Sequence, residues 1–390
     1  MQDILFRFRQ ICENRYELPK QLKSESQKRV FGYFCTYFPA ELVHAAGMLP
    51  LRIMGDKRKG SYTEAHMPSI GCSFIRTALD LGLSGTLDYL DGVIFSHTCD
   101  SMKVLSDIWH ENFKDKFVDN ILFPVKLDGH YSYQFLVKEL KSFKNRLEEY
   151  LGISIEKDRL WESIEVYERN RELLKEVYFW NQENPGILRG SDILNMVISS
   201  MVIPKEEHNK LLQELISHLK QNKLPQRETQ GLARVILAGN ICAFPEIVDA
   251  IEDSNALVVN DDLCTGSRYF VDRSNHTPDI EKNGDPLAYI ARKYLGKSPC
   301  PTKYVPGFSR EQALLDMVKE SKADGVVFLM LRSCDICFFD YPLLKKALDK
   351  EGYPSLFIEY EQQDESFERV RTRVEAFVET IVGIVEGILT

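Results

Sequence analysis

The sequence predicts an α/β protein built from two doubly wound, Rossmann/flavodoxin-like domains that are joined by a helical bridging region. Residues 326–332 are apolar up to their final arginine, which is typical of a parallel strand buried on both faces. The segments DGVIFSHTCD (91–100) and DGVVFLMLRSCD (324–335) repeat one strand-to-helix junction in two distant parts of the chain. Between them, 131–230 changes to long, charged helical periods. Together these features favour two similar α/β units separated by helices.

Length and composition limit the class of protein. A chain of 390 residues exceeds one ordinary core and indicates two or three domains. Its net charge of -9 disfavours a nucleic-acid surface, which needs clustered Lys and Arg. Residues 1–13 carry charges and no apolar core, so they do not resemble a targeting signal, and no apolar run approaches the roughly 18 to 20 residues that span a bilayer. We therefore expect a cytoplasmic protein without a membrane partner.

The expected organisation follows the chain in order. We expect four regions: a helical lead-in (1–30), a first α/β domain (31–130), a helical region (131–230) and a second α/β domain (231–390). The first domain opens with a strand that ends by Pro39, followed by a helix over 40–46 that Gly47 closes.

The second domain opens with a βαβ pattern. Strand-like runs at 234–240 and 256–262 flank the helical segment PEIVDAIEDS, and a right-handed crossover is expected. The chain contains neither G-x-G-x-x-G nor G-x-x-x-x-G-K-[ST]. These absences argue against dinucleotide binding or ATP hydrolysis in the usual loops.

Nine cysteines need an explanation other than disulfides in a reducing compartment, and metal binding is the leading one. Cys334 and Cys337 form a C-x-x-C at the carboxyl end of a buried strand, where open α/β sheets place their ligands. Cys72 precedes a predicted helix, whose N-terminus would stabilise a thiolate. The spacing leaves zinc, an iron–sulfur cluster and a redox dithiol open, and buried cysteines are also common as small core residues.

The remaining cysteines divide into two groups. Cys264 follows a predicted strand, and Cys300 lies in the extended sequence SPCPT. Cys12, Cys35 and Cys242 are expected to be structural. His97 lies at a strand end next to Cys99, where it is either a ligand, a proton donor or a hydrogen-bonded structural residue.

The combination GCSFIR, HTCD, NDDLCTGSRYF, PCPTK, RSCDICFFDYP and RTRVEAFVE resembles the 2-hydroxyacyl-CoA dehydratase family, which includes benzoyl-CoA reductase subunits and double-cubane cluster proteins. The resemblance implies that Cys72, Cys99 and Cys334 hold a [4Fe-4S] cluster at the domain interface. Cys264, Cys300 and Cys337 are the available extra ligands for a double-cubane [8Fe-9S] cluster. The double-cubane pattern also has a cysteine between the equivalents of Cys72 and Cys99 that this chain lacks, so cluster size stays open.

The resemblance also implies partners and a reaction. A separate ATP-hydrolysing [4Fe-4S] activator would supply a low-potential electron, and the chain would form a homo- or heterodimer with a related subunit. The substrate would be an acyl-CoA, with His97 and Arg332 as candidate catalytic residues and Arg268, Arg332 and Lys303 as candidate contacts for its phosphates. The alternatives are a double-cubane reductase of small molecules that works as a homodimer, and an electron-relay partner subunit.

Overall fold

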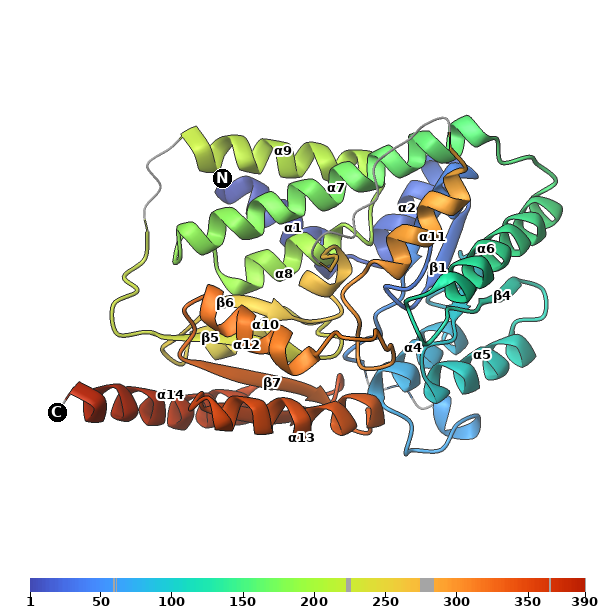
Figure 1. Cartoon of the computed structure of the whole chain (residues 1–390). Helices are drawn as coiled ribbons and strands as arrows, with labels where there is room; N and C mark the ends of the chain where they lie inside the picture. The colour runs from blue at the N-terminus through green and yellow to red at the C-terminus, as the bar shows by residue number, and fades with distance from the viewer. Residues whose placement is uncertain (59, 61, 222–225, 274–283, 365, 390) are drawn as a thin grey trace.

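Two parallel sheets of the same strand order organise the molecule. The computed structural model describes residues 1–58, 60, 62–221, 226–273, 284–364 and 366–389 (Figure 1). The first sheet has the order β2-β1-β3-β4 and consists of β1 (Val30–Tyr33), β2 (Leu49–Arg52), β3 (Gly92–Ser96) and β4 (Phe117–Ile121). The second has the order β6-β5-β7-β8 and consists of β5 (Ala233–Gly239), β6 (Ala256–Asp262), β7 (Gly325–Leu331) and β8 (Ser355–Tyr360). The predicted fold class is confirmed.

Helices cover both sheets and form a layer beside them. Those next to the first sheet are α3 (Ala40–Ala45), the short 3-10 helix η1 (Thr63–Ala65), α4 (Ser73–Leu83) and α5 (Asp100–Asn112). Those next to the second are α10 (Glu246–Glu252), η2 (Ser267–Tyr269), α12 (Arg310–Glu320), α13 (Asp335–Lys350) and α14 (Glu368–Leu389). The others are α1 (Gln2–Glu13), α2 (Glu17–Ser26), α6 (His130–Leu151), α7 (Lys157–Glu183), α8 (Gly190–Ser199), α9 (Lys205–Gln221) and α11 (Pro286–Leu295). None of the helices in the described part of the chain is long and apolar enough to cross a membrane.

The central strands of the second sheet, β5 and β7, are buried on both faces. Along β7, Val326 and Phe328 pack in a cluster with residues of α12 and α13, whereas Val327 and Leu329 pack in the opposite cluster. That opposite cluster also contains Phe95 of β3. One hydrophobic core therefore runs across one face of both sheets and joins the two units.

The two similar strand-to-helix segments, 91–100 and 324–335, occupy equivalent positions in the two sheets. β3 and β7 are third in their sheets, and each is preceded by an aspartate that accepts a hydrogen bond from a backbone N–H of the neighbouring central strand. Asp91 accepts from Val30 at 2.8 Å, and Asp324 accepts from Arg234 at 2.7 Å. The similarity of the two segments thus reflects one arrangement used twice.

One segment of the C-terminal part packs on the first unit. Helix α11 follows β6 in sequence but contacts α6 and α7, beside the first sheet (Figure 1). Further along the chain, the Tyr304 backbone exchanges hydrogen bonds of 2.8 Å with Val125 and Leu127. The polypeptide therefore crosses between the two units after β6 and returns before β7.

Candidate functional site

Cys72, Cys99 and Cys334 share one local geometry. Each is the residue immediately before a helix: Cys72 before α4, Cys99 before α5 and Cys334 before α13. Each helix begins there because a strand or loop delivers the chain to the edge of a sheet and the next residues have a helical apolar period. The first-turn N–H groups and the helix dipole favour negative charge at this position, which partly offsets the effect of burial on these sulfurs.

The three sulfurs influence one another although they come from different units. Burial raises the pKa of Cys72 to about 11, and the negative charge of Cys334 contributes to the rise. Burial raises the pKa of Cys99 to about 12, with further contributions from Cys72 and Cys334. The structure thus brings two cysteines of the first unit close to one of the second.

Cys334 and Cys337 form an unequal pair. A hydrogen bond from the Cys337 thiol, with a smaller contribution from the Asn240 amide, lowers the pKa of Cys334 to about 6. The same bond raises the pKa of Cys337 well above its usual value. The side-chain nitrogen of Asn240, beside this pair, is buried. Cys334 is therefore the more acidic thiol of the two.

A second group of cysteines surrounds Arg268. This guanidinium is 3% exposed, and its Nε lies 2.9 Å from Oδ1 of Asp262. Burial disfavours its charge, but Asp262 and the nearby thiols outweigh burial and raise the pKa of Arg268. Those thiols belong to Cys264, Cys337 and Cys300. One terminal nitrogen, Nη1, is buried and has no hydrogen-bond partner among the described residues, which is unusual for a buried donor.

Cys35 is a further candidate, although its sequence context indicates a structural role. It follows β1, is half-buried, and its charge contributes to raising the pKa of Cys99. Its position after a strand is the same signal that points to Cys264. Cys12 and Cys242, in contrast, are buried, and burial raises the pKa of each to about 12.

The other candidate residues have different surroundings. His97 lies half-buried between β3 and α5, and its ring makes no hydrogen bond with a described residue. Arg332 is 54% exposed and lies 3.4 Å from both Glu359 and Glu361, so its charge is already paired. Arg268 and Lys303 are buried. That either of them contacts the phosphates of an incoming CoA stays a prediction.

The chemistry of these side chains suits an iron–sulfur cluster. Across the described ranges, no group of three His, Cys, Asp or Glu side chains is arranged to hold a single metal ion. Sulfur donors that are buried, as in Cys72, or half-buried, as in Cys99 and Cys334, are the kind of ligand that iron–sulfur clusters use.

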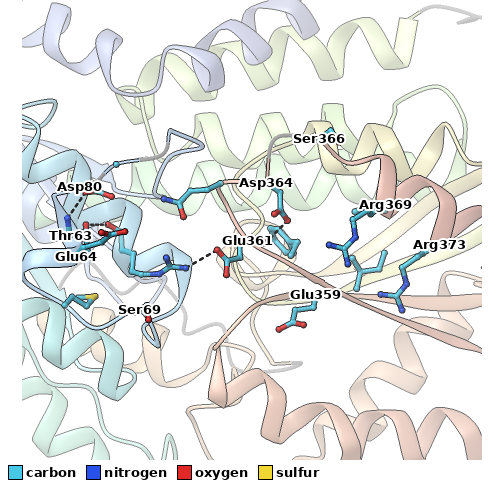
Figure 2. Close-up of a pocket in the computed structure, with 17 residues that line it drawn as sticks. Thr63, Glu64, Ser69, Asp80, Glu359, Glu361, Asp364, Ser366, Arg369 and Arg373 are labelled. Atoms are coloured by element: carbon cyan, nitrogen blue, oxygen red, sulfur yellow. Dashed lines mark hydrogen bonds and ion pairs between the residues drawn. The ribbon is translucent and has the colours of Figure 1, made fainter.

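A buried contact joins the segment after β8 to the first turn of α4. The backbone N–H of Gln362 donates to Ser73 Oγ at 3.1 Å, and Thr77 Oγ1 donates to Gln362 Oε1 at 2.6 Å. Beside it, Arg76 pairs with Glu361 at 3.1 Å (Figure 2). Because Cys72 caps this same turn, the contact fixes Cys72 relative to the second unit.

Comparison with known proteins identifies the family. The family model described as "2-hydroxyglutaryl-CoA dehydratase, D-component" matches residues 35–381. The chain belongs to this family. It is 30% identical to the (R)-phenyllactyl-CoA dehydratase beta subunit of Clostridium sporogenes, over 96% of this chain and 97% of that one. It is also 28% identical to a benzoyl-CoA reductase subunit of Thauera aromatica, over 95% and 97% of the two chains.

A third relative, the lactoyl-CoA dehydratase subunit beta of Anaerotignum propionicum, is 29% identical over 97% of this chain and 98% of that one. These matches confirm the family resemblance noted in the sequence. They make this chain an enzyme of the lyase or oxidoreductase type, and the relatives' names describe them as subunits.

Proposed function

We propose that this chain is the iron–sulfur subunit of an enzyme that receives a low-potential electron from an ATP-dependent activator and reduces or dehydrates an acyl-CoA. The convergence of Cys72, Cys99 and Cys334 at three helix N-termini is the observation that carries the proposal. Membership in a family whose relatives are named as acyl-CoA dehydratase and reductase subunits supports the substrate class.

Cys72, Cys99 and Cys334 would hold the cluster, which when bound supplies one-electron chemistry. The protein's own contribution is to bury these sulfurs and keep water away from them. Burial and thiolate ligation lower a cluster's potential, whereas a nearby cation raises it. Arg268 is such a cation, since its charge acts on Cys337 and Cys264. The balance between these groups would set the potential at which an electron is accepted.

The group around Arg268 supports a second candidate function, a double-cubane reductase of small molecules acting as a homodimer. Cys264, Cys300 and Cys337 lie around a buried guanidinium that has a free donor, and a second cluster would place negative charge there. Against it stands the family naming of the relatives as subunits of acyl-CoA enzymes. We therefore rank the acyl-CoA enzyme first and expect a related subunit and an activator as partners.

Three single substitutions test the ligand assignment. We expect Cys72→Ala, Cys99→Ala and Cys334→Ala each to remove most iron from anaerobically purified protein, because a cluster cannot replace a thiolate with a methyl group. Cys12→Ala is the matched control, since Cys12 is a buried cysteine that donates to Asn195 O at 3.2 Å, away from the group. Full iron retention in Cys334→Ala, with the control also loaded, would refute the assignment.

A further inference from the structure

A cavity of about 590 Å³ lies where the 63–80 segment of the first unit meets the end of β8 and the start of α14 (Figure 2). Its volume is in the range of small-molecule sites. Ile358, Tyr360 and Val370 are buried side chains that contribute an apolar part of the lining. The cavity is thus formed by both units and is large enough for a nucleotide-sized ligand.

Most carboxylates that line this cavity already have partners. Asp80 accepts from the Thr63 N–H at 3.0 Å, Asp364 from the Glu361 N–H at 2.9 Å, Glu359 pairs with Arg332 at 3.4 Å and Glu361 with Arg76 at 3.1 Å. Glu64, the remaining acid, is exposed and lies across the cavity from α14 (Figure 2). Arginines therefore neutralise Glu359 and Glu361, whereas Asp80 and Asp364 are held in place by backbone N–H groups.

The arginines of α14 that line this cavity are not neutralised. Arg369 and Arg373 are four residues apart on α14, and Figure 2 shows both on the cavity side of this helix. Neither makes an ion pair or hydrogen bond with any residue that the structure describes. Like charges at this spacing repel each other on a helix, and an anion between them would remove the repulsion. The α14 wall therefore offers two neighbouring guanidinium groups without a counter-charge.

We propose that this cavity binds a diphosphate group through Arg369 and Arg373. A guanidinium binds phosphate oxygens with two parallel hydrogen bonds, and two guanidiniums one helical turn apart suit two linked phosphates. The same chemistry occurs in a CoA ester and in a free nucleoside diphosphate. The CoA source rests on the proposed function.

The cavity is also adjacent to the cysteine group. Arg76, in its wall, is four residues along α4 from Cys72. Tyr360, in its lining, lies close enough to Cys334 that the thiolate, after burial and Cys242, raises the pKa of the phenol. A CoA ester whose diphosphate is bound at α14 would therefore lie beside the proposed cluster.

Calorimetric titration of the purified, iron-loaded protein with CoA, ADP and pyrophosphate tests the site. We expect Arg369→Gln and Arg373→Gln each to raise the Kd for CoA and pyrophosphate about tenfold or more. Arg371→Gln is the matched control: it lies between them on α14 but pairs with Asp253 at 3.6 Å and does not line the cavity. Its Kd should stay within about twofold of the wild type.

Three results would overturn the inference: no binding of any probe to the wild type, an unchanged Kd in Arg369→Gln and Arg373→Gln, or an equal loss in Arg371→Gln. Tighter binding of CoA than of ADP would identify a CoA ester as the source, and the reverse a nucleoside diphosphate. Iron is measured on the same samples. Wild-type protein that lacks iron but binds CoA through Arg369 and Arg373 would refute the proposed cluster and leave this site intact.

Discussion

The different ionisation of Cys334 and Cys337 shows how single residues shape the site. The two thiols are three positions apart at the start of α13, and their interaction lowers the pKa of Cys334 and raises the pKa of Cys337. Cys334 is therefore the more acidic of the two. This difference predicts that the two have unequal importance for the cluster.

Substitution of the second cysteine group separates a single from a double cubane. If the cluster is a single [4Fe-4S], we expect Cys264→Ala, Cys300→Ala and Cys337→Ala to keep about four irons per chain, because none of these thiols is then a ligand. A double cubane should instead start from about eight irons and lose a second subcluster or collapse. Iron assays and electron paramagnetic resonance spectra of the three variants distinguish these outcomes. A loss of all iron from a variant of a four-iron protein would contradict the single-cubane assignment of ligands.

The structural position of a single residue could be predicted from the sequence only where its neighbours in the chain determine it. The position of Cys72 before a helix and those of Cys99 and Cys334 at strand-to-helix junctions could be predicted from local sequence, whereas their assignment as a ligand set came from the family resemblance. Cys35 lies in the aromatic segment FGYFCTYFP, whose composition indicates core, so its neighbourhood with Cys99 became visible only in three dimensions. The burial of Arg268 likewise depends on segments distant in sequence, such as Gly239, whose carbonyl oxygen accepts from it.

At the level of elements, the contact between the segment after β8 and α4 links the two halves of the site. Gln362 is 1% exposed and makes hydrogen bonds to Ser73, Thr77 and the Met54 carbonyl oxygen, the last at 2.8 Å. Since Cys72 caps α4, a shift of this turn would move its sulfur away from Cys334. The contact therefore positions Cys72, the proposed ligand, through residues that are not themselves proposed ligands.

Replacing Gln362 by Ala should lower iron retention. We expect faster loss of iron to a chelator together with a stability loss of about 1 to 3 kcal/mol, because buried hydrogen bonds are removed. Ser254→Ala is the control, as Ser254 is buried and donates to Ala250 O at 2.9 Å near the amino end of β6. Chelation kinetics and thermal unfolding of both variants give the comparison. Equal rates of iron loss at equal destabilisation would mean that Gln362 has only a structural role.

The strands and the capped helices could be predicted from the sequence, because hydrophobic periodicity and the residues that end a helix are local features. The apolar run before Cys334 is a strand buried on both faces, and the helix expected over 40–46 is α3. The packing of α11 on α6 and α7 was not predictable, since its amphipathic face, with Leu287 and Ile290, is compatible with either unit. Helix periodicity specifies which face is buried and not which neighbour covers it.

For the molecule as a whole, the hydrophobic core and the candidate site both include residues of the two units. One hydrophobic cluster crosses one face of both sheets, so the two units are held together by burial and not only by polar contacts. This arrangement brings Cys99 of the first unit near Cys334 of the second. A cluster that uses both would add its binding free energy to the stability of the joined units.

Iron and acid-labile sulfide, measured together with zinc in anaerobically purified wild-type protein, test the central claim most directly. We predict a brown protein with about four or about eight irons per chain and a similar amount of sulfide, because thiolates from both units would hold a cubane or a double cubane. Zinc at full occupancy without acid-labile sulfide would contradict the account, since the same thiols would then hold a single ion and have no electron to transfer.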